Sequence, residues 1–281
     1  MNFPKKTNLE IAALAPVKES ILADFQGNKP KNSYLISGAS FVGKAETAWQ
    51  IARSVVDEKY WDLDICVLDA EYSKIGIKDL RQMQEMLSRS AHGEYKFCII
   101  RAIECLSIPA INSLLKVLED TKQKLCFILT SNNSQLVLDT IKSRCQSFNV
   151  SNCVADLDID LSGHELESKV FFGKNALALH YIEDEGFRAD FESFWQQWEL
   201  FFESGSDKLF KGFLADQDRK ALALYLELIS LWCGQHKQEL GLENFAFASR
   251  ECLSVRKLIR QNSNQKLALE VLSLKLNQVC G

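Results

Sequence analysis

Short apolar runs alternate with amphipathic segments along the first half of the chain. The apolar runs predict strands at 34–37, 66–68, 97–100, 126–129 and 148–150. Apolar residues at helical spacing predict helices over 45–55, 77–87, 107–118 and 136–142. The run 97–100 contains no polar residue, which is typical of a strand covered on both faces in a parallel sheet. We therefore predict an α/β domain with a parallel sheet flanked by helices.

The pattern changes after residue 150. An acidic, irregular stretch at 154–162 is followed only by helical patterns, at 166–172, 176–183, 191–202, 220–233 and 265–279. Bulky aromatic residues recur at helical spacing within one of them: Trp195, Trp198, Phe201 and Phe202. We expect these side chains to form a core face, and the alternative is part of a subunit interface. The second half is thus predicted to be all helical.

Composition and charge narrow the class of protein. Hydrophobic residues make up 47% of the chain and charged residues 25%, which is ordinary for a soluble globular protein. No apolar run approaches the roughly 18 residues of a membrane span, and residues 1–8 are not followed by the apolar core of an export signal. We therefore expect a cytoplasmic protein with no membrane partner. The net charge of −4 includes no basic stripe of the kind that a DNA-wrapping surface carries, so we expect any nucleic acid to be held by partners.

The nine cysteines show neither a zinc-binding nor a disulfide pattern, because no two of them are separated by just two residues. Cys98 and Cys126 lie inside apolar runs that are predicted to be strands. Buried thiols in a reducing compartment are the simplest interpretation. We expect no metal site.

Residues 38–45, GASFVGKA, fit the phosphate-binding pattern GxxxxGK between a predicted strand and a predicted helix. Gly38 and Gly43 would let the loop wrap a phosphate, and the following helix N-terminus favours an anion. Lys44 would reach the outer phosphates. The context predicts a nucleotide site of the P-loop type.

The residues that would hold magnesium are missing from this pattern. Ala45 stands where a serine or threonine hydroxyl should bind the metal, and Thr47 would face elsewhere on the helix. Arg101 and Ala102 follow the third strand where acidic residues should stand, and an arginine repels a cation. Glu104 is offset from that position, and we expect it to cap the next helix. We therefore predict no intrinsic ATPase activity and at most weak binding of ATP or ADP.

Three further segments carry a family resemblance. Residues 114–119 read LLKVLE, Ser143, Arg144 and Cys145 form an SRC motif, and Thr130, Ser131 and Asn132 occupy a sensor 1 position. Together with the loop 38–44, they resemble bacterial clamp-loader AAA+ subunits of DNA polymerase III over roughly residues 10–150. Within that family the pattern resembles the delta-prime type, in which nucleotide motifs are degenerate while SRC is retained.

The resemblance implies an architecture and a set of partners. It implies an AAA+ P-loop-like domain over 1–155, a helical lid over 156–205 and a helical collar over 206–281. The implied partners are gamma/tau-type and delta subunits, the ring-shaped sliding clamp and primed DNA. Arg144 would be an arginine finger in the ATP site of a neighbouring subunit. The alternative for Arg144 is a simple pair with an acid at a helix end.

Two departures from the family accompany the resemblance. Many delta-prime subunits carry a four-cysteine zinc module before the third strand, but only Cys66 lies in that interval, so no zinc is expected. Asn175 stands where the sensor 2 arginine usually lies.

Three other functions stay open. The first is an active AAA+ or P-loop ATPase or kinase with an unusual metal site. The second is an inert AAA+ scaffold outside replication. The third is direct DNA-binding regulation, which the lack of a basic stripe disfavours.

Overall fold

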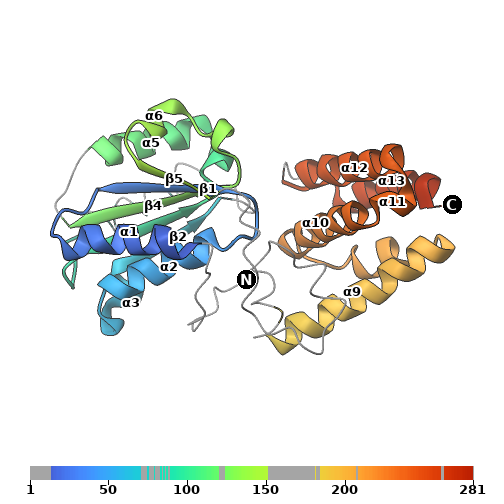
Figure 1. The fold of residues 1–281 in the computed structure, drawn as a ribbon, viewed down its shortest axis with the longest axis horizontal. Coiled ribbons are helices and arrows are strands. Elements are labelled where there is room, and N and C mark those ends of the chain that lie inside the picture. The colour runs from blue at the N-terminus through green and yellow to red at the C-terminus, as the bar shows by residue number, and fades with distance from the viewer. Residues whose placement is uncertain are drawn as a thin grey trace. The chain divides into compact units, whose positions relative to one another are not determined.

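The computed structural model describes residues 14–70, 75, 79, 83, 85, 87, 89–119, 124–150, 181, 184–206, 208–260 and 263–280. The chain forms two compact units (Figure 1): the described residues up to Val150 lie in the first unit, and those from Tyr181 onward lie in the second. The helices expected at 77–87, 166–172 and 176–183 fall largely or wholly outside the described residues. The expected boundary at 155 also falls outside them, and the lid–collar division at 205 stays a prediction.

A five-stranded parallel sheet forms the centre of the first unit, as the alternating pattern predicted. The order across the sheet is β2-β3-β4-β1-β5, and all paired strands are parallel. The strands are β1 (Ser33–Gly38), β2 (Ile65–Asp69), β3 (Lys96–Arg101), β4 (Leu125–Ser131) and β5 (Gln146–Val150). Each of them covers one of the predicted apolar runs.

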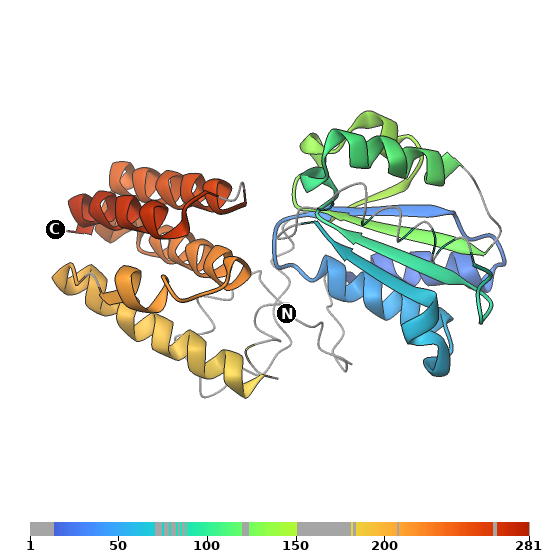
Figure 2. The ribbon, with the colours of Figure 1, turned by 180° about the vertical axis from the view of Figure 1, so that it is seen from behind.

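Helices cover both faces of this sheet (Figures 1 and 2). One face carries α1 (Ala15–Gln26), α2 (Lys44–Val55) and α3 (Trp61–Asp64), with the 3-10 turn η2 (Glu58–Tyr60). The other face carries α5 (Ile108–Glu119) and α6 (Asp139–Lys142), with the turns η3 (Ile103–Cys105) and η4 (Ser134–Leu136). The helix predicted over 136–142 is therefore a 3-10 turn followed by a short α-helix, and α1 was not predicted.

Alternate side chains of the strands β1 to β4 enter two separate cores. Tyr34 and Ile36 pack with α1 and α2, whereas Leu35 packs with α5 and α6. The side chains of 97–100 are at most 1% exposed, which confirms that β3 is covered on both faces. Burial of one such large apolar side chain contributes about 1.5–3 kcal/mol. The two cores hold the strand ends in a fixed relation to each other.

A buried carboxylate fixes the loop that leads into β3. Asp64 is 1% exposed, and its oxygens accept hydrogen bonds from the backbone N–H groups of Gly93 at 2.7 Å and His92 at 3.1 Å. The buried ammonium of Lys96 lies 3.9 Å away. Burial favours the neutral acid, but the hydrogen bonds and the lysine charge outweigh it and lower the pKa of Asp64 below its ordinary value.

The second unit is helical, as predicted. It contains α9 (Glu185–Ser204), the π-helical turn η5 (Leu209–Phe213), α10 (Arg219–Gln235), α11 (Lys237–Leu240), α12 (Leu242–Arg260) and α13 (Gln265–Cys280). The helices expected at 191–202, 220–233 and 265–279 are confirmed, whereas α12 was not predicted. None of the helices in the described ranges is long and apolar enough to cross a membrane.

Aromatic contacts join α9 to the rest of the second unit. Phe194 lies 4.5 Å from Tyr225 and Trp198 lies 5.4 Å from Trp232, both measured between ring centroids. Trp198 is 1% exposed, and Trp195 and Phe201 are buried with it. The predicted aromatic face of this helix is therefore a core face of the chain itself.

Candidate functional site

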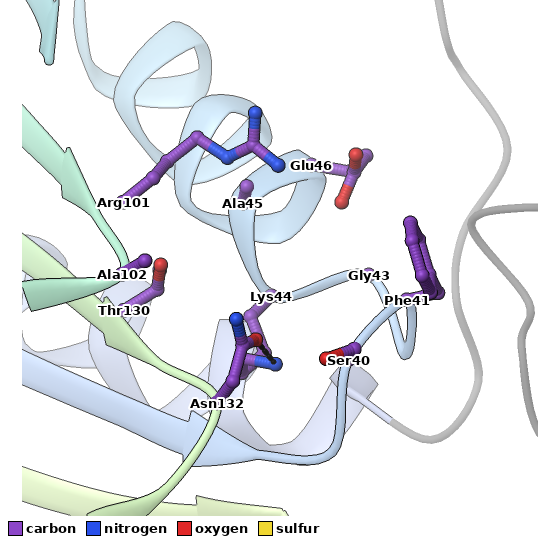
Figure 3. A pocket seen from close by; sticks show the side chains of 10 residues that line it. All are labelled: Ser40, Phe41, Gly43, Lys44, Ala45, Glu46, Arg101, Ala102, Thr130 and Asn132. Carbon is purple, nitrogen blue, oxygen red and sulfur yellow. Dashed lines mark hydrogen bonds between the residues drawn. The ribbon is translucent and has the colours of Figure 1, made fainter. Parts of the chain in front are cut away.

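The candidate site lies where the carboxyl ends of β1, β3 and β4 meet at one edge of the sheet. In a parallel sheet the loops that follow neighbouring strands converge there and form ligand sites. Residues at or just after the carboxyl ends of these three strands line one pocket (Figure 3): Ser40, Phe41, Gly43, Lys44, Ala45, Glu46, Arg101, Ala102, Thr130 and Asn132. The structure thus brings Gly43 and Lys44 of the predicted phosphate loop together with Thr130 and Asn132, whereas Gly38 and Ser131 are not among the lining residues.

The two glycines of the loop are required by the backbone. A Cβ atom on Gly38 would lie 2.5 Å from the carbonyl oxygen of Val150, so no side chain fits between β1 and β5. Gly43 has a φ of 100°, in the left-handed region that favours glycine, and it precedes the first residue of α2. No side chain caps this helix N-terminus. The local geometry is therefore that of a loop that can approach an anion.

Lys44 is 5% exposed and is held by the protein itself. Its ammonium donates to the carbonyl oxygens of Gly38, at 3.0 Å, and Ala39, and to Oδ1 of Asn132 at 3.1 Å (Figure 3). An ammonium has three N–H donors, so the bonds to these three oxygens are enough to occupy it. The lysine that was predicted to reach a phosphate thus ties the loop to the end of β4.

The positions at which the sequence pattern led us to expect magnesium ligands hold Ala45 and Arg101, which do not suit magnesium. Ala45 offers only a methyl group, and Arg101 ends β3 and pairs through Nη1 with Oδ2 of Asp69 at 2.7 Å. Glu46 is the one acidic residue among those that line the pocket. A cation here would face both Lys44 and Arg101. In the part of the chain that the structure describes, no cluster of three His, Cys, Asp or Glu side chains could hold a metal ion.

Glu104 does not cap α5, so that prediction was wrong. Its Oε1 accepts a hydrogen bond from the backbone N–H of Asn132 at 2.9 Å. The turn η3 directs this side chain back toward the end of β4 rather than forward to the next helix. Its other oxygen, Oε2, is buried and has no hydrogen-bond partner among the described residues. Glu104 and Lys44 therefore both bind Asn132, a connection that local spacing could not indicate.

Ser143, Arg144 and Cys145 lie between α6 and β5, away from the residues that line the pocket. The guanidinium of Arg144 donates through Nη1 to the carbonyl oxygen of Thr140 at 2.9 Å and forms an ion pair with Glu119 through Nη2. Glu119 is the last residue of α5. The contact in this chain is therefore a pair with an acid at a helix end, the alternative stated above.

The other two residues of this segment have structural contacts. Ser143 Oγ donates to the carbonyl oxygen of Thr140 at 3.2 Å. Cys145 is partly buried and packs against the core under α5, and burial raises the pKa of its thiol although a hydrogen bond with Ser33 acts the other way. A thiol of that kind is unreactive at neutral pH. Asn175, at the expected sensor 2 position, lies outside the described residues.

Comparison with known proteins gives a consistent group of relatives. A family model described as "DNA polymerase III, delta subunit" matches residues 60–153. The chain is 28% identical to DNA polymerase III subunit delta' of Haemophilus influenzae over 218 residues, which are 73% of this chain and 64% of that protein. It is 27% identical to DNA polymerase III subunit gamma of Buchnera aphidicola over 162 residues, 51% of this chain and 44% of that protein.

The chain thus spans less than two thirds of the length of either relative. A solved structure titled as a DNA polymerase III, gamma subunit-related protein from Thermotoga maritima is similar over 96% of this chain and all of that one. Its TM-score is 0.58 and its sequence identity 17%, so this likeness shows the fold alone. The sequence matches confirm the resemblance to subunits of DNA polymerase III that the motifs indicated.

Proposed function

We propose that this chain, which resembles the delta-prime and gamma subunits of DNA polymerase III, is a non-catalytic subunit of a clamp loader in DNA replication. It completes the loader ring and presents Arg144 to nucleotide bound by a neighbouring subunit. The observation that carries the non-catalytic part is that Ala45 and Arg101 both line the pocket that contains Gly43 and Lys44.

Charge explains why this pocket does not support hydrolysis. Phosphoryl transfer depends on magnesium to neutralise the developing negative charge. A unit charge roughly 4 Å from another contributes about 4 kcal/mol at an effective dielectric of 20, and a divalent cation doubles that value. The positive charge of Arg101 therefore opposes metal binding at this pocket, and its pair with Asp69 reduces that effect. No ligand compensates at Ala45.

Nucleotide binding at the same pocket is weak in this proposal. A phosphate would have to replace the oxygens of Gly38, Ala39 and Asn132 around the Lys44 ammonium. Those bonds are already made in a buried setting, so the exchange gains little free energy. We therefore propose that ATP or ADP binds weakly or not at all, and that the loop serves mainly to join β1 to β4.

The chemistry of Arg144 suits a finger in trans. A guanidinium keeps its charge at any pH met in a cell and donates in a fork that matches phosphoryl oxygens. An arginine supplied by a neighbour can be worth 10³–10⁵ in rate. The Arg144 side chain is 34% exposed, so a phosphoryl group of a neighbouring subunit can reach the guanidinium without the cost of uncovering a buried charge. The finger can therefore meet a phosphate without a large penalty.

The proposed partners follow from the resemblance and the charge. Gamma/tau-type subunits would supply the ATP that Arg144 contacts, and a delta subunit and the sliding clamp would complete the assembly. The net charge of −4 does not favour direct binding of DNA by this chain. Primed DNA is therefore proposed to be held mainly by the complex.

Arg144→Ala in a loader assembled with the same organism's gamma/tau-type and delta-type subunits tests this proposal. With clamp and primed DNA present, we expect the ATPase rate to fall at least about ten-fold while the subunits still assemble. Lys142→Ala is the matched control, since its side chain is also 34% exposed and it lies two residues before Arg144. We expect it to change the rate less than about two-fold.

Two results would favour the other functions. ATP hydrolysis by the isolated chain would indicate an active P-loop enzyme with an unusual metal site. An intact complex that is unaffected by Arg144→Ala, or the failure of any loader to assemble with this chain, would favour an inert scaffold outside replication. Size-exclusion chromatography with light scattering reports assembly independently of the rate.

A further inference from the structure

The side chain of Arg144 is held at two points that belong to different helices. Glu119, at the end of α5, forms an ion pair with Nη2, and the carbonyl oxygen of Thr140, in α6, accepts from Nη1 at 2.9 Å. We infer that Glu119 is a positioning residue for Arg144, which orients the guanidinium for a phosphoryl group on a neighbouring subunit. This inference rests on the proposed function.

The donors of the guanidinium support this inference. An arginine has five N–H donors in a rigid plane. The hydrogen bonds of Arg144 in the described chain involve Nη1 and Nη2, with Thr140, Glu119 and a long 3.5 Å contact to Ser143 Oγ. Nε–H and a second N–H of Nη2 have no partner there. Two donors are therefore left for an incoming oxygen while the other contacts keep the plane in place.

The anchors themselves are fixed by the core. Leu114 and Leu118 of α5 are buried against the sheet, which holds the end of the helix where Glu119 stands. The backbone of Arg144 donates its N–H to Ile141 at 3.1 Å, and its carbonyl oxygen accepts from the hydroxyl of Ser33 in β1. The two residues of the ion pair are therefore attached to backbone segments that the core holds in place.

Orientation is the effect that such a pair can supply. An exposed arginine has about 2 kcal/mol of side-chain entropy to lose when it is ordered. If Glu119 already holds the guanidinium in place, less side-chain entropy is lost when Arg144 contacts a phosphate. The direct Coulomb effect is small, because both side chains are more than one third exposed to solvent. The opposite possibility is that the Glu119 charge repels the phosphate and restrains the finger, and the two ideas predict opposite changes in rate.

Glu119→Ala and Glu119→Gln in the assembled loader decide between them. With clamp and primed DNA present, we expect Glu119→Ala to lower kcat for ATP two- to five-fold with KM unchanged, because the finger acts in the transition state. Glu119→Gln keeps an oxygen acceptor, and its rate should lie between those of the wild type and the alanine variant. Asp139→Asn is the matched control, since that carboxylate pairs with Lys142 instead of Arg144.

A double variant tests whether Glu119 acts through Arg144. In an Arg144→Ala background, Glu119→Ala should cause no further loss of rate. An equal loss in that background, an increase in rate on removing Glu119, or no change at all would each overturn the inference. An unaffected rate for Arg144→Ala alone would instead overturn the proposed function. Thermal unfolding of each variant checks that a lost rate does not come from a lost fold.

Discussion

Replacing Lys44 with alanine separates a structural lysine from a phosphate ligand. The substitution removes three hydrogen bonds from a charged donor that is 5% exposed, and it leaves oxygens of Gly38, Ala39 and Asn132 without that partner. A hydrogen bond to a charged group contributes about 1.5–3 kcal/mol, and the cost of burying the ammonium offsets part of the sum. We expect the free energy of unfolding to fall by about 2–4 kcal/mol.

Urea denaturation followed by far-UV circular dichroism measures this change. Lys116→Ala serves as the control, because it removes an exposed lysine from α5 and should change the free energy of unfolding by less than about 0.5 kcal/mol. The same titrations are repeated with 1 mM ATP without magnesium. If the dissociation constant is 1 mM or weaker, ATP stabilises the wild type by no more than about 0.4 kcal/mol.

Two results would refute this reasoning. Unchanged stability in Lys44→Ala would mean that the ammonium does not make these contacts in solution and is free to bind a ligand. Stabilisation of the wild type by ATP that is well above 0.4 kcal/mol, and that the substitution abolishes, would mean that Lys44 binds phosphate in this chain. The first result would remove the structural role of Lys44, and the second would make the pocket a working nucleotide site.

Two further predictions concern the first unit. Gly38→Ala should lower the free energy of unfolding by about 2 kcal/mol or more, because its Cβ atom would lie 2.5 Å from the Val150 carbonyl oxygen and push β1 and β5 apart; urea denaturation measures it. Burial opposes ionisation of Asp64, but its hydrogen bonds lower the pKa below the ordinary value near 3.9, so the folded state favours the carboxylate. The ionised Asp64 carboxylate therefore stabilises the fold at neutral pH, and this contribution is lost as the pH falls below about 4. The difference in the free energy of unfolding between the wild type and Asp64→Asn should accordingly narrow from pH 7 to pH 3. A difference that stays constant over that range would contradict this assignment.

The sheet was predictable because its strands carry strong local signals. Runs such as 97–100 are apolar throughout, and an apolar run of that length is itself the signal of a strand that is buried on both faces. The helices α1 and α12 carry weaker signals. In α1 only Ile21 and Phe25 are buried, and the buried positions of α12 include the small residues Ala248 and Cys252. Their helical structure depends on packing against neighbours more than on a visible apolar stripe.

The chemical character of the candidate site was also visible in the sequence, and its contacts were not. That Ala45 and Arg101 would line the pocket, without a hydroxyl or an acid at either place, followed from residue identity and from the strand–loop–helix pattern. The side chain of Glu104 was misjudged, because its partner Asn132 is 28 residues away. Periodicity indicates which face of an element is apolar but not which polar groups will meet.

By itself, the sequence determined the strands, the α/β and helical halves, and the types of residue that the pocket would contain. The tertiary structure decided that Lys44 binds Asn132, 88 residues away, and that Arg144 pairs with Glu119, 25 residues away. The sheet order β2-β3-β4-β1-β5 brings the ends of distant strands together, and that order arises from long-range packing. Hydrophobic burial is encoded locally, whereas polar contacts depend on where the packed elements place each side chain.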